Sequence, residues 1–317
     1  MQIDVSIAFF LLGAFAALVR SDIQFPKALY QSLILFLMIA IGLKGGIALS
    51  EHASAELVMQ SVYIVLFGLF LPVIAFPVLY YIGKLPRVDA ASIAAHYGSV
   101  SVGTYAVAIA VLESQGIPYE AYIPLFVVLL EMPAIAVGIA LAKRSTGDKG
   151  AQAQRVETRK LLHEVFFNQG IILMVGGLLI GYVAGQRTAT IAPFFFDLFN
   201  GVLALFLLEM GMVAASRVRE IGQVGGFMLA FGVAMPVVGG FLGAALGLGM
   251  GLSTGGAILV AVLGASASYI AVPAAMHVVL PQANHSLSIS ASLGITFPFN
   301  VLVGIPLYIV VTQWIAG

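Results

Sequence analysis

The sequence contains no cysteine and very few charged residues for its length. The absence of cysteine from all 317 residues excludes disulfides, thiol catalysis and cysteine metal ligands. Charged residues make up 9% of the chain, whereas soluble proteins carry roughly 25%. Charges are too scarce to cover a surface in water, so a soluble globular protein is excluded. Basic and acidic residues balance at 14 each, and this neutrality gives no indication of a nucleic-acid partner.

Hydrophobic residues take the place of the missing charges. They make up 61% of the chain, and the mean hydropathy is +1.07. A membrane-spanning helix needs about 20 mostly apolar residues, and backbone in lipid favours helices. We therefore expect an all-α, multi-pass membrane protein in a lipid bilayer, without a cleaved signal peptide, because no basic residue precedes the first apolar run. We expect ten transmembrane helices, at 5–19, 28–49, 56–82, 87–112, 119–142, 162–185, 194–215, 224–248, 254–280 and 286–315.

The basic residues are distributed unevenly between the two sides of such a bundle. Of the 14 lysines and arginines, all but Lys44 and Arg187 lie in loops that follow odd-numbered spans. Loops rich in lysine and arginine stay in the cytoplasm. We therefore expect the odd-numbered loops to be cytoplasmic and both termini to lie outside.

The two halves of the sequence resemble each other at an offset of about 165 residues. Each half holds five expected spans, an odd number, so the second copy enters the membrane from the opposite side. Such a 5+5 inverted repeat is common among transporters that work by alternating access. We expect a first repeat over 1–143, a cytoplasmic linker over 144–161 and a second repeat over 162–317. The matching positions are 67–73 with 231–237, Lys44 with Glu209, 104–105 with 268–269, and 131–133 with 296–298.

The fourth and ninth spans contain stretches rich in glycine and serine. Residues 98–105 read Gly-Ser-Val-Ser-Val-Gly-Thr-Tyr, and residues 264–269 read Gly-Ala-Ser-Ala-Ser-Tyr. Inverted-repeat transporters break helices near the membrane midplane, where free N–H groups suit an anion and free carbonyls suit a small cation. Close packing of small residues is the alternative. We expect broken, crossing helices whose substrate site comprises Gly98, Ser99, Ser101, Gly103, Thr104, Ala265, Ser266, Ala267, Ser268 and Tyr269.

Few ionisable residues lie inside the expected spans, where each charge costs at least about 2.5 to 3.5 kcal/mol. Glu131 is one, and its repeat equivalent is Thr296, with Asn300 one helical turn further on. Because hard cations prefer oxygen ligands, we predict that Glu131, Thr296 and Asn300 bind sodium. A protonated carboxyl at a helix break is the alternative for Glu131. Lys44 and Glu209 are expected to form an ion pair with each other.

Several strings in the sequence resemble one known family. The strings are HEVFFN at 163–168, DLFNG at 197–201, LLEMGM at 207–212, GASASYIA at 264–271, TFPFN at 296–300 and GSVSVGT at 98–104. They are similar to the sodium-dependent bicarbonate transporters of the SbtA type, and the similarity runs from the first span to the last.

This resemblance implies a bacterial plasma-membrane (inner-membrane) permease that couples bicarbonate entry to sodium. Its spans would divide into a core domain and a gate domain, the crossed broken helices would hold the substrate, and three protomers would form a homotrimer. Cyanobacterial relatives bind a PII-like signalling protein from the cytoplasm, so such a protein is the implied regulatory partner. The chain differs from these relatives in its short central linker.

Three classes of function follow from these observations. The first is sodium-coupled symport of bicarbonate or a similar small oxyanion by elevator-like alternating access, with Na+ as the coupling ion. The second is a proton-coupled transporter or sodium/proton exchanger on the same architecture, using Glu131 or Glu209. The third, a membrane enzyme, is disfavoured, because no HExxH helix or nucleotide loop occurs and His96 is expected to be a satisfied core histidine rather than part of a catalytic pair.

Overall fold

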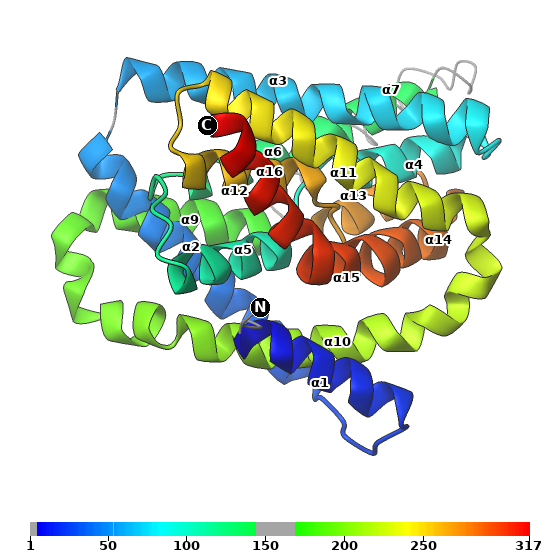
Figure 1. Cartoon of the computed structure of the whole chain (residues 1–317), viewed down its shortest axis with the longest axis horizontal. Coiled ribbons are helices and arrows are strands. Elements are labelled where there is room, and N and C mark those ends of the chain that lie inside the picture. Colours follow the sequence, from blue (N-terminus) through cyan, green and yellow to red (C-terminus); the bar gives the residue numbers. More distant parts are fainter. Residues whose placement is uncertain (1–4, 53, 144–168) are drawn as a thin grey trace.

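The computed structural model describes residues 5–52, 54–143 and 169–317 (Figure 1). All regular elements in these ranges are helices or helical turns, and the described residues contain no strand. An all-α fold is therefore confirmed for this part of the chain. The expected linker over 144–161 and the start of the second repeat lie outside the described residues.

Glycine, proline and serine divide the apolar chain into successive helices. The first half contains α1 (Val5–Leu18), α2 (Lys27–His52), α3 (Ala55–Pro77), α4 (Arg87–Gly98), α5 (Val102–Ser114), α6 (Pro124–Glu131) and α7 (Pro133–Lys143). The second half contains α9 (Gln169–Ala184), α10 (Phe199–Val224), α11 (Gly226–Gly249), α12 (Thr254–Ala265), α13 (Ala271–Val279), α14 (His285–Ile289), α15 (Phe297–Phe299) and α16 (Ile305–Ala316). A π-helical segment, η4 (Ser290–Thr296), joins α14 to α15.

Eight helical segments among the described residues are long and apolar enough to cross a membrane. Two shorter apolar helices, α1 with 14 residues and α12 with 12, occupy the first and ninth expected spans. Both are shorter than the roughly 20 residues of a complete span, and α12 is followed by α13 after an interruption. The structure thus supports a multi-pass membrane protein, and the count of ten spans stays a prediction. The eight segments are Lys27–His52, Ala55–Ile82, Arg87–Ser114, Pro124–Ala142, Gln169–Thr190, Phe199–Arg217, Gly226–Gly249 and His285–Ala316.

The helices pack in two groups. In the first, α1 packs along α10, α2 packs along α9, and α2 also contacts α10; we call α1, α2, α9 and α10 the four-helix group. In the second, α11 packs along α12, and α3 packs against α4, α6 and α7; together with α5 and α13 to α16 these form the broken-helix group. Figure 1 shows α1 and α10 along the lower edge of the molecule, α3 along the upper edge, and α11 running diagonally below α3.

Glycines at matching positions of the two halves make close helix contacts. Gly46 of α2 lies against the Leu178 carbonyl of α9, and Gly211 of α10 lies against the Phe10 carbonyl of α1. A Cβ atom at either glycine would collide with backbone, which cannot move aside as a flexible side chain can. Small residues of this kind let membrane helices approach closely. The α2–α9 and α1–α10 contacts therefore use equivalent positions with the halves exchanged.

Candidate functional site

The fourth expected span is interrupted where the sequence places two serines. α4 ends at Gly98 and α5 begins at Val102. Ser99 and Ser101 between them have extended backbones, with φ of −98° and −110°. The Ser101 hydroxyl accepts a hydrogen bond from the Thr104 backbone N–H at 3.1 Å, so it caps α5 in the manner that favours serine at helix N-termini. The predicted break is therefore present.

A second interruption divides the ninth expected span. α12 ends immediately before Ser266, whose hydroxyl donates to the Leu263 carbonyl at 2.8 Å. The Ser268 hydroxyl accepts from the Val272 backbone N–H in the first turn of α13, at 3.3 Å. Serine side chains thus bond the backbone groups left free at both sides of this break.

The two interruptions contact each other directly. The Ser101 N–H donates to the Ser266 hydroxyl at 3.1 Å, and the Ser268 N–H donates to the His96 carbonyl at 2.8 Å. His96 Nδ1 lies 2.6 Å from the Ser268 carbonyl oxygen, and only a protonated ring nitrogen can donate there. His96 Nε2 has no hydrogen-bond partner among the described residues. His96 therefore joins the breaks as a core residue, satisfied at one nitrogen.

A small buried cavity lies where the breaks meet α6 and the four-helix group. Its volume is about 10 Å³, close to the roughly 10–15 Å³ that one water molecule needs. Glu131 at the end of α6 is only 3% exposed, and its Oε2 atom has no hydrogen-bond partner among the described residues. The cavity lining thus combines a buried carboxyl residue with serines and a tyrosine. Its lining consists of Met38, Val100, Ser101, Val102, Glu131, Gly170, Ser268, Tyr269, Ile270 and Ala271.

Two helix N-termini converge on this cavity. Val102 is the first residue of α5, Ala271 is the first residue of α13, and both line the cavity wall. The N-terminus of a helix carries a partial positive charge and N–H groups that no residue of the same helix can bond. An anion at this junction would meet two such ends at once.

The glycines of the predicted site allow neighbouring side chains to approach the backbone closely. A Cβ atom at Gly98 would overlap the ring of Pro72 in α3, and one at Gly103 would come 2.5 Å from the Tyr269 hydroxyl. Ala267 is also buried, at 2% exposure. These three residues make room for the breaks and present no polar side chain to the cavity.

Two further residues of the predicted site hold its polar groups in position. The Thr104 hydroxyl donates to the Ser101 hydroxyl oxygen at 2.9 Å. The Ser99 hydroxyl donates to the Glu131 carbonyl at 3.4 Å, a long contact. Neither Ser99 nor Thr104 lines the cavity. The structure therefore brings Ser101, Ser268 and Tyr269 to the cavity and places the other predicted residues around it.

Thr296 and Asn300 do not join Glu131. The Thr296 hydroxyl donates to the Gly232 carbonyl at 2.7 Å, and the Asn300 amide donates to the Ala265 carbonyl at 2.7 Å. Neither side chain lines the cavity that holds Glu131. Of the three predicted sodium ligands, only Glu131 lines this cavity, and the other two bond backbone of α11 and α12.

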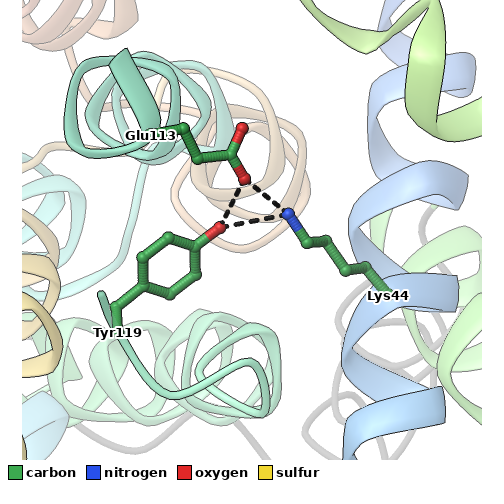
Figure 2. A network of polar contacts seen from close by, with 3 residues as sticks. All are labelled: Lys44, Glu113 and Tyr119. Atoms are coloured by element: carbon green, nitrogen blue, oxygen red, sulfur yellow. Dashed lines mark hydrogen bonds and ion pairs between the residues drawn. The ribbon is translucent and has the colours of Figure 1, made fainter. Parts of the chain in front are cut away.

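Lys44 forms an ion pair with Glu113, so the expected pair with Glu209 is wrong. Lys44 Nζ lies 2.6 Å from Glu113 Oε1 and 3.1 Å from the Tyr119 hydroxyl (Figure 2). The long lysine side chain extends from α2 to the end of α5, whereas Glu209 lies on α10. Sequence reasoning missed Glu113 and Tyr119, because polar residues are ordinary at the edge of a span and carry no signal of a specific partner.

Comparison with known protein families gives a match over nearly the whole chain. A family model described as the Na+-dependent bicarbonate transporter superfamily matches residues 6–313. The match runs from α1 into α16 and includes both breaks and Glu131. No curated protein sequence matches the chain. Because the family model matches nearly the full length of the chain, the protein belongs to the Na+-dependent bicarbonate transporter superfamily.

Proposed function

We propose that the protein is a sodium-coupled symporter that imports bicarbonate or a similar small oxyanion by alternating access. The observation that supports this most is the convergence of two interrupted helices on one buried polar cavity. Membership of the superfamily supports both the substrate and sodium as the coupling ion. Because that family is one of transporters, we assign transport rather than catalysis.

The anion would lie against the N-termini of α5 and α13. Ser101 Oγ already accepts two hydrogen bonds from Thr104, and Ser268 Oγ accepts one from Val272. Each hydroxyl therefore keeps its own O–H group for donation, and both line the cavity. Two O–H donors and two helix ends suit a small monovalent anion. A dianion that needs bidentate arginine would find none in this lining.

Sodium would bind beside the anion at Glu131. An ionised carboxylate only accepts hydrogen bonds or binds cations, and Glu131, whose Oε2 atom has no hydrogen-bond partner among the described residues, lines the same cavity as Ser101. Sodium there would neutralise both the carboxylate and the anion, which gives a direct reason for coupled binding. In this proposal Thr296 and Asn300 support the site indirectly, because they hold backbone carbonyls of α11 and α12.

Transport requires the cavity to widen. Its volume of about 10 Å³ suits one water-sized guest, so an anion of four heavy atoms needs a wider site. Met38 of α2 and Gly170 of α9 form the wall contributed by the four-helix group. We infer an elevator-like movement of the broken-helix group against this wall. The exchanged glycine contacts of α1–α10 and α2–α9 support an inverted repeat, in which outward and inward states are structurally alike.

The proposal includes the orientation of the protein in the membrane, its cellular location and its partners. The distribution of basic residues supports cytoplasmic odd-numbered loops and external termini. A bacterial plasma membrane, a homotrimer and a PII-like regulatory partner rest on the family resemblance alone.

Reconstituted protein tests the coupling. We expect liposomes to accumulate isotopically labelled bicarbonate when an inward sodium gradient is imposed, and to lose this uptake when potassium replaces sodium or a sodium ionophore dissipates the gradient. Liposomes without protein control for carbon dioxide permeation. Equal uptake with and without the gradient would contradict symport.

The unpartnered Glu131 oxygen favours one alternative, proton-coupled transport or sodium/proton exchange, because a buried carboxyl can carry a proton. A pH-sensitive dye inside bicarbonate-free liposomes separates the two functions. Under an inward sodium gradient, an exchanger would make the interior alkaline, whereas a bicarbonate symporter without substrate would leave it unchanged.

A further inference from the structure

Lys44, Glu113 and Tyr119 form a cluster away from the helix breaks (Figure 2). Lys44 comes from α2 in the four-helix group, whereas Glu113 lies in the last turn of α5 in the broken-helix group. One Glu113 oxygen, Oε1, accepts hydrogen bonds from Lys44 Nζ at 2.6 Å and from the Tyr119 hydroxyl at 2.8 Å. The Lys44 ammonium also donates to the Tyr119 hydroxyl oxygen at 3.1 Å. A carboxylate is thus bound by an ammonium and a phenol across the boundary between the two groups.

Stability does not explain a lysine at this position. A lysine inside an apolar span is costly to bury, and Lys44 is eight residues, about 12 Å, from the end of α2. The Lys44 and Glu113 side chains are 42% and 39% exposed, and ion pairs that are this open contribute little to stability. The Lys44 ammonium is therefore not enclosed by its partner carboxylate.

The cluster lines a cavity larger than the one at the breaks. The volume is about 50 Å³, enough for roughly three to five water-sized guests or one small oxyanion. Tyr105 lines it while fully buried, and its hydroxyl has no hydrogen-bond partner in the part of the chain that the structure describes. Asn200 of α10 adds an amide to the lining. Residues that carry ammonium, phenol and amide groups thus line one cavity.

The cavity follows one face of α5 towards the break. Tyr105, Ile109 and Glu113 all line it and are spaced four residues apart, so they share a helix face over about 12 Å. Tyr105 lies three residues after Val102, where α5 begins beside the smaller cavity. The larger cavity therefore extends from the end of α5 to within about one helical turn of the breaks.

The phenol in the cluster stays a donor at physiological pH. Tyr119 lies between α5 and α6, outside the spans. Burial raises the pKa of its hydroxyl to about 12, although the Lys44 charge opposes the shift. Its O–H therefore persists to donate to a carboxylate or to another anion in the same place.

We propose that this cavity is an outer binding site for a small monovalent oxyanion of the bicarbonate class. In the absence of the anion, the Glu113 carboxylate occupies the binding position on Lys44, and the incoming anion displaces it. A carboxylate and bicarbonate share a planar, delocalised O–C–O group with one negative charge, so Lys44 and Tyr119 would bind both alike. Competition from Glu113 keeps the affinity low enough for onward release to the breaks. The inference rests on the proposed function, including the orientation that puts this end of α5 outside.

Kinetic variants test the site in reconstituted protein. Lys44→Met is expected to raise the KM for bicarbonate about tenfold, the scale of one charge-assisted hydrogen bond, whereas Lys44→Arg retains most of the affinity. Glu113→Gln removes the competing carboxylate and is expected to lower KM severalfold. The double variant Lys44→Met/Glu113→Gln is expected to keep the raised KM. Glu51→Gln, an acid near the same end of α2 that bonds Gln186 instead, is the matched control.

The double variant distinguishes a binding site from a structural ion pair. If the pair only joins α2 to α5, both single variants will impair transport alike, and the double variant will regain the wild-type KM. That result, or an unchanged KM in Lys44→Met, overturns the inference while leaving symport intact.

A second measurement does not depend on transport. Peptide mass spectrometry of purified protein follows modification of Lys44 by an amine-reactive reagent. We expect bicarbonate and formate to slow it in wild type and more strongly in Glu113→Gln, while leaving Lys84 unaffected. If wild type shows no sodium-driven uptake but this protection occurs, the outer site stands and the proposed function fails. Absence of protection by either anion overturns the outer site.

Discussion

Ser101 and Ser266 lie 165 residues apart in the chain, and the Ser101 N–H donates a 3.1 Å hydrogen bond to the Ser266 hydroxyl. Around the breaks the proposed repeat pairs 104–105 with 268–269, so Ser101 contacts the residue that follows its repeat equivalent, Ala265. Equivalent positions of a two-fold arrangement meet only near the axis that relates them. This bond therefore supports a cavity at the centre of the duplication, where inverted-repeat transporters place their substrates.

Removing the Ser266 hydroxyl should destabilise the junction. In Ser266→Ala the buried Ser101 N–H loses its acceptor, which costs about 1–3 kcal/mol. We expect a lower thermal unfolding midpoint in detergent together with slower uptake. Ser216→Ala is the control, because that exposed hydroxyl only bonds a carbonyl of its own helix. Equal midpoints for the two variants would argue against the bond across the breaks.

Glu131→Gln should remove the sodium response. The amide keeps the shape of the side chain and lacks the charge that a cation needs. We expect sodium-driven uptake to fall at least about tenfold, the effect of losing roughly 1.4 kcal/mol of binding, while the unfolding midpoint is retained. The control is Glu209→Gln, a carboxyl outside the lining of the cavity. Unaltered sodium dependence in Glu131→Gln would remove this residue from the ion site.

Valine in place of Gly46 or Gly211 should separate the helices that each glycine joins. The added atoms meet backbone of α9 or α1, and overpacking of this kind costs about 1–3 kcal/mol. We expect both variants to lower the unfolding midpoint by similar amounts, because they occupy equivalent positions. Gly176→Ala should be neutral or stabilising, since a Cβ there meets no described atom within 4 Å. Strongly unequal effects of the two valine variants would weaken the repeat.

The absence of cysteine makes single-cysteine variants a clean test of orientation. Ser21 follows α1 and Gln115 follows α5, and both are exposed. In intact cells, a membrane-impermeant thiol reagent should label Gln115→Cys at once and Ser21→Cys only after permeabilisation, because the fourth loop is expected outside and the first inside. The reverse pattern would invert the proposed topology.

The helix breaks were predictable from sequence because their cause is local. Glycine weakens a helix, and a serine hydroxyl can cap a new one, as Ser101 does for α5. The ion ligands were harder to predict. Glu131 and Thr296 correspond in the repeat, yet only Glu131 lines the cavity, because Thr296 bonds the Gly232 carbonyl of α11 instead. Two residues at equivalent positions of a repeat therefore need not bind the same ion.

The sequence by itself determined that the chain lies in lipid and forms helices, because 9% charge and long apolar runs can be accommodated only by helices in lipid. It also determined where two of those helices stop. Only the tertiary structure decided which polar groups meet. Lys44 pairs with Glu113 and not with Glu209, and Glu131 lines a cavity with Ser101 and not with Asn300. Such pairings depend on how distant helices pack, and a sequence pattern reports only the neighbours along one helix.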